Sequence, residues 1–385
     1  MVYSEFTKSI TGAAVDKRIS FSCDACILPE NYKWSGTELV NGVQKCRFCK
    51  DHKAPRFLGE DAFIADLALS EGDRVGVNVS GGKDSVYAWY WLVSRLGADR
   101  VVALTYKKTG LTHPLAELNI KNASKILGSE VITVEDNAAH PRFLKNFEAL
   151  LDNPTPEMVR VALCAGCRYG ITARLYAEGY EKMGITRFVS AASYLELAPF
   201  KEELLAERGG GNQKYGLICA LADNCAYSFG DNLEVILRDD DLKYKGGISS
   251  ASKTVTERGI YKLFDMDKYL PNVPEQIERD VIEKLGWQRP ERSWHFDCMI
   301  EHLKDVFYFG MLGYTETDFK LSAMVRHGLI TREAAIAEIS LFKARLADSL
   351  PETEELMRTL GAENLIPKMR EFFKNSEYLH IKGGI

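Results

Sequence analysis

The chain has 385 residues, of which 46% are hydrophobic and 27% are charged, and its net charge is -5. This length accommodates two to three domains, and the composition is that of an ordinary soluble globular protein. The net charge provides no overall basic surface, which weakens the case for a nucleic-acid substrate. The longest apolar runs, such as Val86 to Val93, are far too short to cross a membrane, and Met1 to Phe6 lack the features of a secretory signal. We therefore expect a cytoplasmic enzyme.

The first feature along the chain is a pair of C-x2-C motifs within residues 20–52. They comprise Cys23 with Cys26 and Cys46 with Cys49, and nineteen residues separate the two pairs. In a cytoplasmic protein such cysteines serve as metal ligands or reactive thiols more often than as disulfides. The spacing predicts a zinc ribbon that holds one Zn²⁺ with four thiolates, and four buried or redox-active cysteines are the alternative.

A phosphate-binding turn is predicted directly after the first strand of the main domain. A helix is expected over Asp61 to Leu69, followed by an apolar strand over Arg74 to Val79 and a second helix from Val86. The turn between this strand and the second helix reads Ser80, Gly81, Gly82, Lys83, Asp84, Ser85. Its glycines let the backbone approach an anion closely, while the helix N-terminus and the lysine supply positive charge.

Alternating strands and helices continue after this turn. Strands are predicted over Val101 to Tyr106, Val131 to Val134 and Ile185 to Ala191, with helices over Leu115 to Leu127 and about 170–183. This order indicates an α/β fold with a doubly wound parallel sheet, which binds its ligand at the carboxyl ends of the strands. The second strand ends near Thr105 and Tyr106, and we expect this end to face the adenine of a bound nucleotide.

A third C-x2-C pair, Cys164 and Cys167, lies between the third and fourth predicted strands. It has no partner pair nearby, so a second zinc ribbon is disfavoured. Together with Cys298, or with Cys219 or Cys225, this pair is a possible ligand set for an iron-sulfur cluster that keeps one iron open. A redox dithiol, a split metal site and simple packing of free cysteines are the alternatives.

Helical periodicity dominates beyond Ala198. Amphipathic helices are predicted over Thr331 to Ser349 and Thr353 to Lys374. We therefore expect a zinc-ribbon module over 1–58, an ATP-binding α/β domain over 59–200 and a mainly helical region for a substrate or partner over 201–385.

The turn at residues 80–85 resembles the SGGKDS signature of the PP-loop ATP pyrophosphatase superfamily, whose fold is like that of the adenine nucleotide alpha hydrolases. It differs from the common P-loop because Asp84, instead of Ser or Thr, follows Lys83. The resemblance implies that residues 80–85 bind the pyrophosphate of ATP and that AMP is transferred to a substrate oxygen. Lys83 and Asp84 are the catalytic candidates in the turn, and Mg²⁺ is expected with ATP.

The order of motifs also resembles the N-acetyl sugar amidotransferase family of surface-polysaccharide (lipopolysaccharide) biosynthesis. The matching features are the cysteine pairs, Ile27 to Pro29, the PP-loop, Gly313 with Tyr314, and 325–334. This family implies that ATP activates an oxygen of a sugar acceptor and that ammonia from a separate glutaminase subunit replaces it. Nothing in the chain itself supplies the nitrogen.

A second resemblance is to the PP-loop enzymes that thiolate tRNA. These enzymes carry a C-x2-C followed by Arg at about this distance after the PP-loop, as in Cys164 to Arg168. This family implies catalytic roles for Cys164 and Cys167, a [4Fe-4S] cluster and a tRNA or small-molecule acceptor. The chain departs from that pattern after the fourth strand, where Glu196 is the only acid able to replace a pair of aspartates. The function predicted first is ATP-dependent amidation, and iron-sulfur-dependent thiolation is the alternative.

Overall fold

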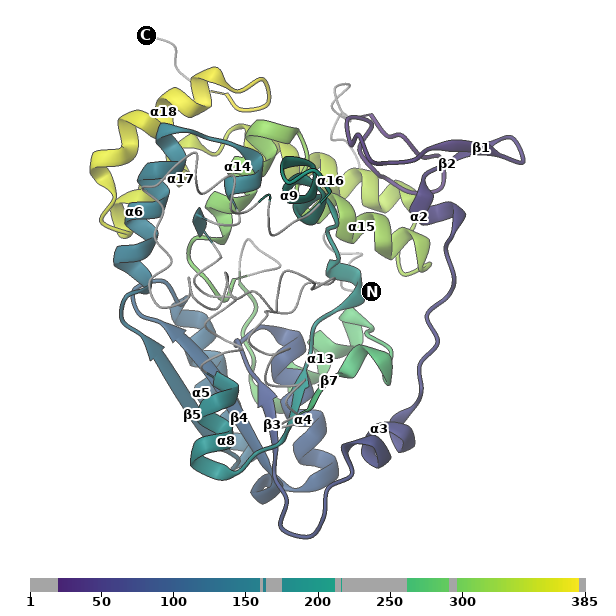
Figure 1. The fold of residues 1–385 in the computed structure, drawn as a ribbon, viewed down its shortest axis with the longest axis vertical. Coiled ribbons are helices and arrows are strands. Elements are labelled where there is room, and N and C mark those ends of the chain that lie inside the picture. Colours follow the sequence, from purple (N-terminus) through teal and green to yellow (C-terminus); the bar gives the residue numbers. More distant parts are fainter. Residues whose placement is uncertain are drawn as a thin grey trace.

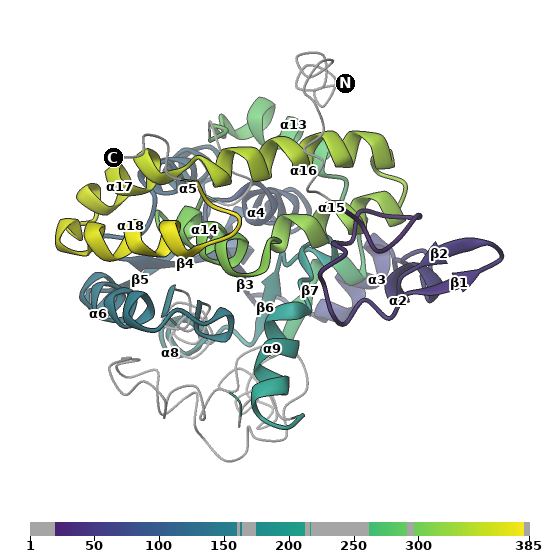
Figure 2. The ribbon, with the colours of Figure 1, turned by 90° about the horizontal axis from the view of Figure 1, so that it is seen from above.

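The computed structural model describes residues 20–159, 162–163, 175–211, 216, 262–290 and 296–380. Its lower half is a twisted sheet flanked by helices, and its upper half is a layer of helices (Figure 1). An extended N-terminal segment with a small hairpin lies at one side of this upper layer (Figure 2).

Within the described residues, the central sheet has five parallel strands in the order β5-β4-β3-β6-β7. The strands are β3 (Val75–Asn78), β4 (Val101–Lys108), β5 (Glu130–Asp136), β6 (Arg187–Ser190) and β7 (Lys262–Asp265). The chain adds β4 and β5 on one side of β3 and then returns to add β6 and β7 on the other side. The strand order therefore reverses between β3 and β6, and such a switch point is where open α/β sheets bind ligands.

Helices cover both faces of this sheet. One face packs against α3 (Glu60–Leu67), α4 (Lys83–Leu96), α5 (Pro114–Leu127) and α13 (Pro274–Leu285), with Phe63, Trp89 and Val281 among the buried side chains. On the other face, α8 (Tyr176–Met183) packs through Tyr176 against Leu104 and Phe188. This arrangement confirms the predicted doubly wound α/β class.

A second core joins the helices above the sheet. It contains α6 (Ala139–Asp152), α9 (Phe200–Arg208), α14 (Glu301–Leu312), α15 (Glu316–Arg326), α16 (Arg332–Ala347), α17 (Leu350–Thr359) and α18 (Ile366–Asn375). Three of the N-terminal cysteines, Cys23, Cys26 and Cys46, are buried in the same core. The cysteine segment is therefore packed into the helical layer.

The N-terminal module has little regular structure of its own. It consists of an antiparallel hairpin, β1 (Glu38–Val40) and β2 (Val43–Lys45), followed by the single-turn helix α2 (Arg47–Lys50). Short 3-10 turns complete the fold at η1 (Ala98–Arg100), η3 (Tyr194–Glu196), η5 (Met266–Lys268) and η6 (Glu363–Leu365). Among the described residues, we find no helix long and apolar enough to span a membrane.

The predicted helix over 353–374 is wrong, because the structure has two helices there. Helix α17 ends near Leu360, and Gly361 follows with a positive φ of 66° that favours glycine. Pro367 then lies in the first turn of α18, where a missing N–H is harmless. Neither α6 and β7 nor the N-terminal elements β1, β2 and α2 were predicted, and for α9, α13, α14 and α15 only a general helical character beyond Ala198 was expected.

Candidate functional site

The turn between β3 and α4 is held by its own serines. The Ser85 Oγ accepts a hydrogen bond from the Ser80 backbone N–H at 3.1 Å and donates to the Gly82 carbonyl at 2.9 Å. Gly82 is the N-cap residue of α4, and no side chain caps this helix. Because the first N–H groups of a helix lack intrahelical partners, this uncapped end is suited to an anion.

Gly81 gives the turn its shape. Its φ of +88° is accessible mainly to glycine, and a Cβ at this position would lie 2.5 Å from the Ala116 carbonyl oxygen. The Gly81 carbonyl accepts a hydrogen bond from the Trp287 indole at 3.0 Å. The turn is therefore packed against α5 and fixed by a residue that follows α13.

Lys83 and Asp84 form an ion pair at the start of α4. The Lys83 Nζ lies 2.7 Å from both carboxylate oxygens of Asp84. The amide of Asn272, which is 6% exposed, donates to the same carboxylate at 3.3 Å. The lysine is thus positioned beside the turn, and an anionic ligand would compete with Asp84 for it.

A pocket of about 260 Å³ opens in front of this turn. It lies at the carboxyl ends of β3, β4 and β6, where the strand order reverses. Its walls include five of the six predicted turn residues, Ser80, Gly82, Lys83, Asp84 and Ser85, together with the predicted Thr105. Gly81 is not part of the pocket wall. The residues expected to bind ATP are therefore gathered around one cavity.

The pocket wall also contains Lys108, which the sequence had not indicated, and Glu196, the acid that the sequence indicated as able to replace a pair of aspartates. Lys108 ends β4, is 6% exposed, and its Nζ lies 3.8 Å from Asp297, which also lines the pocket. Glu196, from η3, lines the pocket as well and pairs with the buried Lys320 at 2.9 Å. Lys108 follows the predicted strand 101–106 by two residues, and this place near a strand end was the available sequence signal for it.

Asp267 lies close to these acids and was also missed. Burial, together with the nearby charges of Asp84, Asp265 and Glu196, raises the pKa of its carboxyl to about 7. A hydrogen bond from the Tyr194 backbone N–H acts in the opposite direction. Asp267 is therefore a weaker acid than an ordinary carboxyl group, and its raised pKa is caused by its surroundings in the fold and not by its local sequence.

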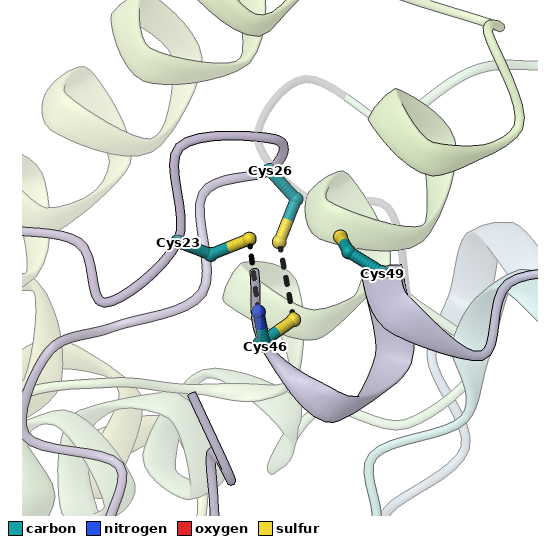
Figure 3. A group of neighbouring side chains, drawn as sticks. All are labelled: Cys23, Cys26, Cys46 and Cys49. Carbon is teal, nitrogen blue, oxygen red and sulfur yellow. Dashed lines mark hydrogen bonds between the residues drawn. The ribbon is translucent and has the colours of Figure 1, made fainter. Parts of the chain in front are cut away.

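The four N-terminal cysteines converge as predicted (Figure 3). Their sulfur atoms all lie within 4.8 Å of one another, and the Sγ atoms of Cys26 and Cys46 are 3.8 Å apart. Four sulfurs at about 2.3 Å from a tetrahedral ion would be roughly 3.8 Å apart, so this group fits a single bound metal ion.

The four thiols differ in acidity because they interact with one another: the pKa values of Cys23 and Cys46 are lowered, whereas those of Cys26 and Cys49 are raised. Hydrogen bonding with Cys26, and then with Cys46 and Cys49, lowers the pKa of the Cys23 thiol. The Cys46 backbone N–H points at the Cys23 Sγ at 3.3 Å (Figure 3). A sulfur that receives such hydrogen bonds is stabilised as the anion that binds a metal.

The loop between the first two cysteines docks onto the C-terminal helices. Arg332, in the first turn of α16, donates to the backbone carbonyls of Cys26 and Cys23 at 3.1 Å and 3.4 Å. Ile27 is fully buried in a cluster that includes Leu195 of η3 and Leu321 of α15. The segment 325–334, singled out by its sequence, thus contacts the cysteine group.

The third cysteine pair, Cys164 and Cys167, lies outside the described residues, as do Cys219 and Cys225. Cys298 is described, is half-buried and does not belong to the four-cysteine group. It forms an isolated β-bridge with Thr112, a pocket residue, and follows Asp297. Burial raises the pKa of its thiol.

Neither a family model nor a curated relative matches the chain. Among solved structures, it is similar to the U34-tRNA thiolase NcsA from Methanococcus maripaludis, determined with its [4Fe-4S] cluster. The identity is 14%, the match covers 91% of this chain and 88% of that chain, and the TM-score is 0.30. A similarity at this TM-score supports no conclusion about function.

Proposed function

We propose that the chain is an ATP-dependent adenylating enzyme of the PP-loop type. ATP binds in the pocket at the switch point, with its pyrophosphate moiety on residues 80–85. The observation that carries this proposal is the uncapped N-terminus of α4, which faces that pocket beside Lys83. Backbone N–H groups, a helix dipole and a lysine together form a site for a polyphosphate.

The proposed reaction starts with attack of an acceptor oxygen on the α-phosphorus of ATP. A bond forms between this oxygen and the α-phosphorus, the bond to the β-phosphate oxygen breaks, and pyrophosphate leaves with the electron pair. Lys83 and the first N–H groups of α4 stabilise the negative charge that develops on the leaving group. Mg²⁺, when bound with ATP, would supply further positive charge.

In the second half-reaction, a nucleophile replaces the adenylated oxygen and AMP departs. We propose ammonia from a partner glutaminase as this nucleophile and an N-acetyl sugar as the acceptor. Support for this choice comes from the sequence order that includes Ile27 and 325–334. This support comes from the order of the motifs and not from the pocket. Ile27 and the segment 325–334 contact the cysteine segment and do not line the pocket.

One observation favours sulfur transfer as a second candidate. Cys298 lies directly after the pocket residue Asp297 and pairs with Thr112 in a β-bridge. A thiol at this place could serve, with Cys164 and Cys167, as a ligand of an iron-sulfur cluster next to the nucleotide. The acceptor in this case is a tRNA or a small molecule.

For the N-terminal group we propose one Zn²⁺ bound by Cys23, Cys26, Cys46 and Cys49. The sulfur spacing supports a single ion, because four thiolates on separate irons of a cluster would lie farther apart. Its chemistry is structural, since four protein ligands leave no open position on the ion.

The test of the adenylating activity measures AMP and pyrophosphate release from ATP in the presence of candidate N-acetyl sugars or tRNA. We expect both products in equal amounts with the correct acceptor, and Lys83→Ala should abolish them while the melting temperature is retained. Lys107→Ala is the control, because Lys107 is paired with Glu117 and Glu135 away from the pocket. Release of ADP and phosphate would contradict the proposal.

A parallel measurement separates the two nucleophiles. Anaerobically purified protein is analysed for iron, acid-labile sulfide and zinc. Zinc without iron, together with ammonia-dependent AMP release, supports amidation. Iron and sulfide that disappear in Cys298→Ser support sulfur transfer.

A further inference from the structure

Two lysines line the pocket, and they are located at the carboxyl ends of different strands. Lys83 follows β3 in the glycine turn, whereas Lys108 is the last residue of β4. No other lysine or arginine belongs to the pocket wall among the described residues. A nucleotide in this pocket therefore meets two separate positive charges.

The sheet register shows where Lys108 stands relative to the turn. Leu104 of β4 pairs with Asn78 at the end of β3, and its carbonyl accepts the Val79 N–H. Lys108 lies four residues farther along β4, roughly 13 Å at about 3.3 Å per residue. Lys108 thus lies farther along the strand direction than the end of β3 that leads into the turn, and both lysines line the same pocket.

Burial makes this lysine a good ligand for an anion. Its relative exposure is 6%, it lines the pocket, and its Nζ lies 3.8 Å from the carboxylate of Asp297, another pocket residue. A charged group removed from water interacts strongly with an opposite charge, because the surrounding dielectric is low. The turn Lys108 to Thr112 is itself fixed, since the Thr112 N–H and Oγ1 both bind the Lys108 carbonyl.

We propose that Lys108 binds the α-phosphate of ATP and remains bound to this phosphate in AMP. This inference rests on the proposed function and assigns a different part of ATP to each of the two lysines. Lys83 binds the pyrophosphate that leaves, and Lys108 binds the adenylyl group that stays. When the bond between the α- and β-phosphates breaks, each product keeps a lysine of its own.

The neighbouring residue provides a matched control. Successive side chains of a strand point to opposite faces, and Lys107 accordingly pairs with Glu117 of α5 and Glu135 of β5. Lys107 does not line the pocket. Lys107→Met removes the same charge from the same strand without touching the nucleotide site.

The experiment measures binding of inorganic pyrophosphate, AMP and α,β-methylene ATP by calorimetry to the full chain. For Lys108→Met, we expect AMP affinity to fall by roughly 10- to 100-fold, with pyrophosphate affinity nearly unchanged, because one charge-assisted hydrogen bond is lost. Lys83→Met should show the reverse pattern. Lys108→Arg should restore most of the AMP affinity, and Lys107→Met should bind all three like the wild type.

The outcomes separate this inference from the function on which it rests. Wild-type protein that binds neither pyrophosphate nor α,β-methylene ATP would overturn the proposed function and this inference with it. Wild-type binding of all three, with AMP affinity unchanged in Lys108→Met, would overturn the inference alone. Equal losses for AMP and pyrophosphate in Lys108→Met would also overturn it, because they indicate a general change in the pocket.

Discussion

The Arg332 guanidinium donates a hydrogen bond to the backbone carbonyl of Cys26, at 3.1 Å between Nε and the oxygen. The two residues are 306 positions apart in the chain. A second bond from the same guanidinium reaches the Cys23 carbonyl at 3.4 Å. The first helical turn of α16 thus holds the loop that supplies two metal-ligand candidates, so the cysteine group and the C-terminal helices stabilise each other.

Replacing Arg332 with Met should weaken both the fold and metal retention. The variant leaves the Cys23 and Cys26 carbonyls without their charged donor, which typically costs about 1–3 kcal/mol of unfolding free energy. Urea unfolding measures the free energy, and competition with a chelator measures the metal. Arg345→Met is the control, because Arg345 is exposed on the same helix. Equal stability of the two variants would show that the contact is dispensable.

The metal group itself is tested with a pair of cysteine variants. Cys46→Ser should lose the bound zinc and lower the melting temperature by several degrees, because Cys46 is fully buried within the four-sulfur group. Cys298→Ser should keep one zinc per chain, since Cys298 lies outside this group. Elemental analysis after gel filtration decides the outcome. Full zinc content in Cys46→Ser would rule out the four-cysteine site.

The two glycines of the nucleotide turn should respond differently to alanine. Gly81→Ala places a Cβ 2.5 Å from a backbone oxygen at a φ of +88°, so we expect a loss of at least about 1–2 kcal/mol in unfolding free energy. Gly82 has an extended backbone, and its added Cβ would meet only the Ser80 Oγ at 3.4 Å. Gly82→Ala should therefore unfold like the wild type. Thermal and urea unfolding of the two variants provide the comparison.

The sequence predicted those elements whose own residues carry a clear local pattern, and it missed elements whose local pattern is weak. The turn at 80–85 is a local motif, and strands such as β3 and β4 are marked by continuous apolar runs. By contrast, β7 is short and bounded by Lys262 and Asp265, so its own pattern is weak. Helix α6 has no capping side chain at its N-terminus, so a local signal for the start of a helix is missing there.

The same distinction applies to the site. Five turn residues and Thr105 line the pocket as expected because their places follow from the order of strands. Trp287 and Asn272 contact the turn from about 200 residues away, and no short motif announces those contacts. The acidity of Asp267 is likewise a product of burial in the folded chain. Such properties arise from tertiary packing and were not accessible from local pattern.

That acidity of Asp267 predicts how stability changes with pH. Its pKa is about 7 in the folded chain, against about 3.9 in an unfolded one. Between these values the native state keeps a proton that the unfolded state has lost, so the unfolding free energy falls as the pH rises. Below about pH 4 both states are protonated, and above about pH 7 both are ionised, so the effect is confined to this window.

Asp267→Asn isolates this contribution, because asparagine cannot ionise and its side-chain oxygen can still accept the Tyr194 N–H. Relative to the wild type, the variant should gain about 1–3 kcal/mol of unfolding free energy between pH 4 and pH 7.5, since the wild-type carboxyl must ionise where it is largely buried. Urea unfolding at intervals of half a pH unit gives the profile. Asp99→Asn, at an exposed carboxylate, should show no such gain. A constant difference between Asp267→Asn and the wild type across this range would mean that Asp267 ionises at its ordinary pKa, and that the neighbouring Asp84 and Glu196 do not act on it.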